Sequence, residues 1–177
     1  VVIVQVAPMD ANGFFNLSTS CSMTPAYLSK AKKIVVEVNT KAPRCLGGLA
    51  ESIHISQVDM VVEGPNSPLL QLPEAQTSDA DRLIAGHVMA LLEDGSTIQL
   101  GIGALPNSVG ALIAQSDLKD LGVHTEMLAD SYVDMYVAGR ITGKRKAIDC
   151  GKMVYTFAMG TQKLYDFLDN NPAAAIF

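Results

Sequence analysis

The sequence contains no tryptophan, few aromatic residues, little basic charge and no long apolar run. Aromatic residues make up 6% of the 177 positions, and 13 basic residues face 18 acidic ones, which gives a formal net charge of -5. Such a chain lacks the basic surface that binds nucleic acid. No apolar run approaches the roughly 18 residues that cross a bilayer. We therefore expect neither a nucleic-acid partner nor a membrane partner.

Cysteine is scarce as well. Cys21, Cys45 and Cys150 are an odd number at wide, irregular spacing, which does not fit a disulfide framework. This pattern favours a reducing, cytoplasmic compartment. What the chain does contain, 49% hydrophobic and 18% charged residues, is typical of a folded globular protein rather than a disordered one.

Short β-branched runs alternate with amphipathic stretches along the chain. Thr24 before Pro25 indicates a helix that begins with Thr24 as its N-cap, and Gly139 fits a helix C-terminus. We predict buried strands at residues 1–6, 33–39 and 58–63, further strands at 97–103, 122–126 and 152–160, and helices at 25–32, 79–92, 106–115, 128–138 and 162–169. This alternation predicts βαβ units, and hence an α/β fold with a mostly parallel sheet.

The helix at 79–92 carries two local signals. Ser78 and Asp81 fit a capping box at its start. Its apolar residues recur at helical spacing, so we expect them to form one side of the helix: Leu83, Ile84, Val88, Leu91 and Leu92.

A proline-rich stretch divides the chain. Pro65, Pro68 and Pro73 fall within residues 63–75, and such a stretch is typical of a linker. We predict one domain that ends near residue 72 and a second that covers 73–177. The chain also begins and ends inside apolar runs, without an initiating Met, so we interpret it as a piece of a longer protein.

A glycine-rich turn at residues 99–107, Gln-Leu-Gly-Ile-Gly-Ala-Leu-Pro-Asn, lies between a predicted strand and a predicted helix. We expect positive φ at Gly101 and Gly103, with backbone N–H groups facing a ligand at the mouth of the sheet. The dinucleotide fingerprint would place a third glycine where Pro106 stands, which argues against a nicotinamide cofactor. A tight turn without any ligand remains an alternative.

Glu126 ends the next predicted strand, just before a predicted helix. One interpretation makes it a helix N-terminal residue, where the macrodipole favours a negative charge. The other makes it a carboxylate nucleophile, with the glycine turn supplying donors for a developing oxyanion.

His124 and Glu126 also match the H-x-E half of a zinc deaminase site. The second half of that motif needs two paired cysteines, and Cys150 is isolated. His54, His87 and His124 share no ligand spacing. We therefore predict no metal site.

A basic run follows Gly139, formed by Arg140, Lys144, Arg145 and Lys146. A solvated loop is the simplest interpretation of such a run. Contact with the phosphates of a cofactor or with a substrate carboxylate is the alternative.

Taken together, these motifs resemble the acetyl-CoA hydrolase/transferase family of CoA-transferases, and within it the 4-hydroxybutyrate and butyryl-CoA:acetate CoA-transferases. The resemblance is carried by residues 99–107 and by 121–127, Leu-Gly-Val-His-Thr-Glu-Met. Further matching stretches, in the same order, are residues 37–39, 43–44, 139–143 and 164–172.

The resemblance implies parts of two parallel-sheet α/β domains of the NagB/RpiA type, in a protein that forms homo-oligomers. It implies that Glu126 is the nucleophile, and that coenzyme A moves between a short-chain acyl-CoA and a free carboxylate through a covalent glutamyl-CoA thioester, with ping-pong kinetics. Acyl-CoA is then a substrate, and no metal or redox cofactor takes part. We assign its binding to Gln99, Gly101, Ile102, Gly103, Ala104 and Asn107.

The chain covers about two-fifths of a family member, and a downstream glycine-rich segment of the family is absent from it. We therefore expect an isolated 177-residue piece to be inactive or to turn over poorly. Two other functions stay open: an acyl-CoA hydrolase, in which water opens the thioester, and a non-catalytic α/β module that binds a phosphorylated metabolite.

Overall fold

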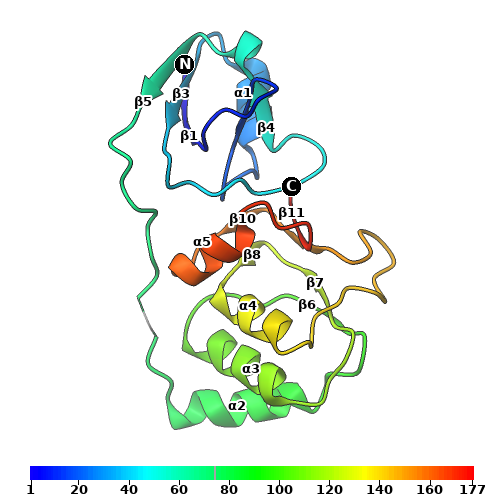
Figure 1. Ribbon diagram of the computed structural model, residues 1–177. Coiled ribbons are helices and arrows are strands. Elements are labelled where there is room, and N and C mark those ends of the chain that lie inside the picture. Colours follow the sequence, from blue (N-terminus) through cyan, green and yellow to red (C-terminus); the bar gives the residue numbers. More distant parts are fainter. Residues whose placement is uncertain (74) are drawn as a thin grey trace.

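The computed structural model describes residues 1–73 and 75–177, which form two lobes joined by an extended connection (Figure 1). We call residues 1–63 the first lobe and residues 79–177 the second lobe. The first lobe contains strands β1 (Val2–Val6), β2 (Phe14–Asn16), β3 (Ile34–Val38), β4 (Ser52–His54) and β5 (Met60–Glu63), helix α1 (Thr24–Lys30) and the 3₁₀ turn η1 (Ile55–Gln57). The second lobe contains strands β6 (Thr97–Ile98), β7 (Gly122–His124), β8 (Met127–Leu128), β9 (Met153–Tyr155), β10 (Phe157–Ala158) and β11 (Ala174–Ile176) and helices α2 (Asp79–Met89), α3 (Ala104–Gln115), α4 (Asp130–Val137) and α5 (Gln162–Leu168).

Parallel pairing dominates both lobes, which confirms the predicted α/β fold. The first lobe has a parallel sheet in the order β1-β3-β5, with a small antiparallel pair of β2 and β4. The second has a parallel sheet in the order β11-β9-β7-β6, and β8 pairs in parallel with β10. Because the strands run the same way, their carboxyl ends meet at one edge of each sheet, and the loops that follow them lie close together.

The first sheet is less buried than the sequence predicts. Every residue of β5 is exposed, and Ile3 of β1 is 71% exposed, whereas Val6 and Val36 are fully buried. Since β1 and β5 are the outer strands of this three-stranded sheet, each has a neighbour on one side only. The prediction of buried strands holds in part for β3, where Ile34 and Val36 are buried, and is wrong for β5 and for β1 apart from Val6.

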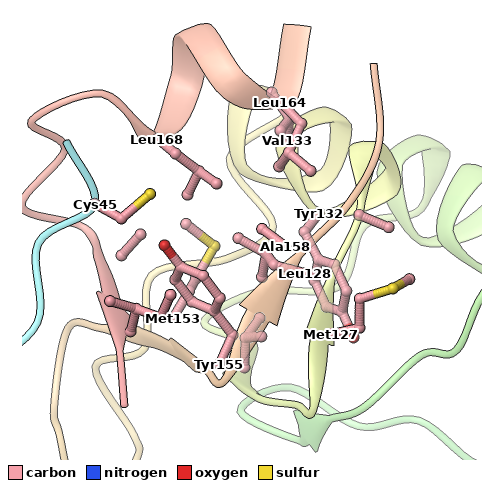
Figure 2. Packing of buried hydrophobic residues seen from close by; sticks show 14 of the residues in the cluster. Cys45, Met127, Leu128, Tyr132, Val133, Met153, Tyr155, Ala158, Leu164 and Leu168 are labelled. Carbon is pink, nitrogen blue, oxygen red and sulfur yellow. The ribbon is translucent and has the colours of Figure 1, made fainter. Parts of the chain in front are cut away.

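The two lobes are joined by backbone hydrogen bonds that cross between them. Residues 19–21 run alongside β10: the Cys21 amide donates to the Thr156 carbonyl at 3.1 Å, and the Ala158 amide donates to the Thr19 carbonyl at 2.8 Å. A second seam joins the Asn170 amide to the Arg44 carbonyl at 2.8 Å. The core of the second lobe lies next to this junction, where Tyr155 and Leu168 pack with Cys45 of the first lobe (Figure 2).

Several element ends differ from the sequence predictions. The strand expected at 97–103 is limited to β6, and α3 begins at Ala104, two residues before Pro106. The strand ends where its pairing with β7 stops at Ile98, and Gly103, with a φ of +113°, is the N-cap of α3. At α1 the N-cap is Met23, so Thr24 already lies in the helix.

Helix α2 confirms one prediction and contradicts another. Its capping box is present: the Asp81 amide donates to the Ser78 hydroxyl at 3.2 Å, and the Ser78 amide donates to the Asp81 carboxylate at 2.9 Å. Its predicted apolar side is shorter than expected, because α2 ends at Met89 and leaves Leu91 and Leu92 outside the helix. Within the helix, Leu83 is 69% exposed while Ala85 is buried. None of the helices within the described ranges is long and apolar enough to span a membrane.

Candidate active site

Glu126 lies in a break between β7 and β8, at the carboxyl end of the second sheet. The Thr125 amide still donates to the Val154 carbonyl at 2.9 Å. The Glu126 carbonyl then accepts hydrogen bonds from the Thr156 amide at 3.0 Å and the Phe157 amide at 3.2 Å, and from the Thr156 hydroxyl at 3.1 Å. The backbone of Glu126 is thus held from β9 and β10, while its side chain is exposed.

The helix-terminus interpretation of Glu126 is wrong. Strand β8 separates Glu126 from α4, and the acidic residue in the first turn of α4 is Asp130. The Asp130 carboxylate accepts hydrogen bonds from the Thr161 amide at 2.8 Å and the Thr161 hydroxyl at 2.7 Å. Asp130 therefore joins the starts of α4 and α5, and the helix dipole does not account for the carboxylate of Glu126.

The glycine turn lies beside this break, because β6 pairs with β7 up to Ile98 and Val123. The expected positive φ is present at Gly103 and absent at Gly101. A Cβ added at Gly103 would have no atom within 4 Å, and one added at Gly101 would only reach the Pro106 ring at 4.0 Å. The space in front of both glycines is therefore open.

The N–H groups of this turn are free to meet a ligand. Within residues 1–73 and 75–177, those of Gly101, Ile102 and Gly103 donate to no protein acceptor. Backbone N–H groups without a protein acceptor commonly bind an anion or an oxyanion. The turn thus offers N–H donors of the kind that can stabilise a developing oxyanion.

A cavity of about 650 Å³ lies between the turn, α3, α4, the start of α5 and the end of the proline-rich stretch. Of the residues assigned to acyl-CoA, Ile102, Gly103 and Asn107 line it, while Gln99, Gly101 and Ala104 do not. Its other residues are Leu72, Pro73, Ala75, Ala111, Ala129, Asp130, Ser131, Asp134, Thr161 and Lys163. Glu126 lies outside this wall, four residues before Asp130.

The basic run after Gly139 does not form one cluster. Lys144 and Arg145 are exposed and lie 4.0 and 3.5 Å from the Asp120 carboxylate. Lys146 is buried, and its ammonium donates to the carbonyls of Val123 at 2.9 Å and Lys152 at 2.7 Å. Burial lowers the pKa of Lys146. The solvated-loop interpretation therefore fits two of these residues and is wrong for Lys146.

Sequence reasoning missed Tyr132 on α4. This side chain is fully buried, and its hydroxyl is 2.5 Å from the amide of Leu100, the residue directly before Gly101. A signal was present, because a tyrosine on the buried side of an apolar helix needs a hydrogen-bond partner for its hydroxyl. The partner could not be named from sequence, since it lies 32 residues away.

His54 and His124 lie in different lobes. His124 is exposed beside Glu126, and the His54 ring accepts a hydrogen bond from the Ser56 amide at the start of η1. In the part of the chain that the structure describes, no three His, Cys, Asp or Glu side chains are placed to hold a metal ion.

Comparison with known proteins gives a consistent result. Residues 1–73 match the family model of the acetyl-CoA hydrolase/transferase N-terminal domain. The chain is 52% identical, over 97% of its length, to butyryl-CoA:acetate CoA-transferase from Anaerostipes caccae. It is 41% identical, again over 97%, to 4-hydroxybutyrate coenzyme A transferase from Clostridium kluyveri. In each case it covers 39% of the relative, so it spans about two-fifths of the length of the curated relatives that it matches.

Solved structures agree with this. RipA from Yersinia pestis superposes with a TM-score of 0.91 at 38% identity, over 97% of this chain and 39% of that one. The 4-hydroxybutyrate CoA-transferase from Porphyromonas gingivalis gives a TM-score of 0.90 at 34% identity, over 99% of this chain and 43% of that one. By sequence and by fold, this chain belongs to the acetyl-CoA hydrolase/transferase family.

Proposed function

We propose that this chain carries the nucleophile and part of the acyl-CoA site of a CoA-transferase that acts on short-chain carboxylates. Glu126 is the nucleophile, and the N–H groups of the glycine turn bind the oxyanion. The observation that carries the proposal is the position of Glu126: an exposed carboxylate on a firmly bonded backbone, beside a turn whose N–H groups are open. Residues 1–72 and 73–177 then belong to two successive domains of the whole protein.

The proposed reaction needs no external acid or base. A Glu126 carboxylate oxygen attacks the thioester carbonyl, the C–S bond breaks, and CoA thiolate leaves an acyl-glutamyl anhydride. The thiolate attacks the glutamyl carbonyl, which releases the donor carboxylate and leaves a glutamyl-CoA thioester. An acceptor carboxylate attacks that thioester and forms a second anhydride and free thiolate. Attack of the thiolate on the acceptor acyl carbon gives the new acyl-CoA and restores Glu126.

The N–H groups of Gly101, Ile102 and Gly103 would stabilise the tetrahedral oxyanion formed in these attacks. Each step develops negative charge on a carbonyl oxygen, and fixed donors stabilise such charge without rearrangement. The cavity next to the turn would hold the part of the thioester beyond the reacting carbon, in contact with Ile102 and Asn107. Gln99, which is exposed after β6, would bind a polar group of the substrate.

Transfer is favoured over hydrolysis by the named relatives. The relatives at 52% and 41% identity are named as CoA-transferases, whereas a relative named acetyl-CoA hydrolase, from Neurospora crassa, is 24% identical. A non-catalytic binding module is disfavoured because the helix terminus, its explanation for Glu126, is occupied by Asp130.

Isotope exchange on the full-length protein tests this function. A ping-pong transferase incorporates labelled acetate into acetyl-CoA without a second acyl group. We expect Glu126→Gln to abolish this exchange while CoA still binds. Glu93→Gln, which changes an exposed glutamate in the loop after α2, is the matched control and should exchange normally. Loss of acetyl-CoA to free CoA without exchange would indicate a hydrolase. Unchanged exchange in Glu126→Gln would refute the assignment of the nucleophile.

A further inference from the structure

The ends of β6 and β7 separate where the candidate site begins. Their pairing stops at Ile98 and Val123, so Leu100 has no strand partner at the position where the ladder would continue. The Tyr132 hydroxyl replaces that partner: it accepts from the Leu100 amide at 2.5 Å and lies 3.3 Å from the Leu100 carbonyl. Leu100, directly before Gly101, is therefore bonded to a side chain of α4.

The ring of Tyr132 lies beside the other half of the site. It is next to Met127, the residue directly after Glu126 (Figure 2). Thr125, the residue directly before Glu126, is buried and donates from its hydroxyl to the Met127 carbonyl at 3.0 Å. Burial raises the pKa of Tyr132, and the Thr125 side chain and the Leu100 amide oppose that rise. Tyr132 is thus bonded to the residue directly before Gly101 and lies beside the residue directly after Glu126.

The ring of Tyr132 is well suited to hold both segments in place. It is fully buried and lies beside Met127 in the core of the second lobe (Figure 2). A tyrosine has only two side-chain torsions, and close packing fixes both. Movement of the turn relative to Glu126 would therefore disturb either the hydrogen bond of Tyr132 to Leu100 or its packing against Met127.

We propose that Tyr132 is a positioning residue, which sets the distance between the N–H groups of the glycine turn and the carboxylate of Glu126. This inference rests on the proposed function. Tyr132 does not touch the substrate; it acts through its hydrogen bond to Leu100 and its packing against Met127. Nucleophilic attack requires reacting groups within a narrow range of distance and angle, and a shift of about 1 Å can cost roughly 100-fold in rate.

The test uses Tyr132→Phe in the full-length protein, with Tyr155→Phe as the matched control. Both changes remove one hydroxyl from a fully buried ring of the same core. The Tyr155 hydroxyl faces Cys45 (Figure 2) and is not hydrogen-bonded to any backbone group in the described ranges. We expect Tyr132→Phe to lower kcat about 10- to 100-fold and to leave KM for acyl-CoA within about twofold, because ground-state binding is retained. Tyr155→Phe should change neither constant more than about twofold.

A direct readout separates positioning from stability. The rate of formation of a borohydride-reducible adduct at Glu126 should fall in Tyr132→Phe by the same factor as kcat, at a temperature where both variants are fully folded.

The possible results are distinguishable. An adduct that forms as fast in Tyr132→Phe as in the unaltered protein would overturn the positioning role and leave the proposed function intact. Equal losses in Tyr132→Phe and Tyr155→Phe would assign the effect to general packing and also overturn it. Absence of the adduct in the unaltered protein would refute the proposed function itself, and the positioning role with it.

Discussion

Gly101 and Gly103 stand two positions apart in one turn, yet they are glycine for different reasons. Gly103 has φ +113° and ψ -176°, a backbone conformation that residues other than glycine rarely adopt. Gly101 has no positive φ, and its added Cβ would meet nothing closer than 4.0 Å. The backbone conformation therefore requires glycine at position 103 only. A ligand that approaches the backbone closely would explain the glycine at position 101.

Paired alanine variants separate these two reasons. Gly103→Ala should lower the free energy of unfolding by about 1–3 kcal/mol, the usual cost of such a backbone conformation. Gly101→Ala should leave stability within about 0.5 kcal/mol but raise KM for acyl-CoA, because its methyl group would enter the space that the thioester needs. Chemical denaturation and steady-state kinetics give the two values. An unchanged KM for acyl-CoA in Gly101→Ala would show that the substrate does not contact this part of the turn.

Asp10 should make stability depend on pH in the acid range. Its carboxylate accepts from the amides of Asn12 and Phe14, each at 2.9 Å, and from Arg44 at 2.8 Å. The Phe14 hydrogen bond, together with Asn12 and Arg44, holds the pKa of Asp10 below its ordinary value. A lowered folded-state pKa stabilises the protein above the unfolded value of about 3.9, and this contribution disappears as the pH falls through the folded value.

Asp10→Asn tests that dependence. The variant should be less stable than the unaltered protein at pH 7, and the difference should shrink below about pH 3.9, where the unaltered carboxyl also becomes neutral. Urea unfolding at a series of pH values measures it. A difference that stayed constant across that series would show that the charge of Asp10 is not involved.

At the level of elements, sequence patterns predicted the presence of a helix or strand more reliably than its first and last residues. Ser78, Asp81 and Gly139 signalled helix ends that are present, since capping depends on neighbouring residues alone. The break between β7 and β8 was not predicted, because it depends on hydrogen bonds from Thr156 and Phe157 to Glu126, about 30 residues away in sequence. The exposed Leu83 of α2 was missed because periodicity identifies an apolar side without identifying what covers it.

The cap of α2 can be tested locally. Ser78→Ala removes the hydroxyl that accepts from the Asp81 amide and should destabilise the helix start by about 1 kcal/mol. Ser78→Thr keeps an acceptor and is the control. Native-state hydrogen exchange of the first turn of α2 measures the effect. Equal protection in both variants would mean that packing, rather than the cap, holds this turn.

At the scale of the whole molecule, the parallel pairing of the strands and the candidate nucleophile could be predicted from sequence. The contacts between the lobes could not. Glu126 follows a recognisable strand at the expected edge of a parallel sheet. By contrast, the Arg44 amide donates to the Asp169 carboxylate at 2.8 Å across 125 positions. No local signal in the sequence connects two residues so far apart.

That contact gives a prediction for the junction of the lobes. Asp169→Ala should lower stability by about 0.5–1.5 kcal/mol, the net value of one hydrogen bond. Asp169→Asn keeps an acceptor oxygen for the Arg44 amide and should be close to neutral. Thermal unfolding of the full-length variants distinguishes them. An equal loss in both would point to the charge of Asp169 instead of its hydrogen bond.

Chemical trapping can detect the proposed covalent intermediate on Glu126. The full-length protein is incubated with acetyl-CoA and reduced with borohydride, and the peptide that spans residues 122–140 is analysed by mass spectrometry. Borohydride converts a glutamyl thioester to an alcohol and leaves a free carboxylate unchanged. We predict a loss of one oxygen and a gain of two hydrogens, confined to Glu126 and dependent on acetyl-CoA. An unmodified Glu126, in a protein that binds and turns over acetyl-CoA, would show that Glu126 is not the nucleophile.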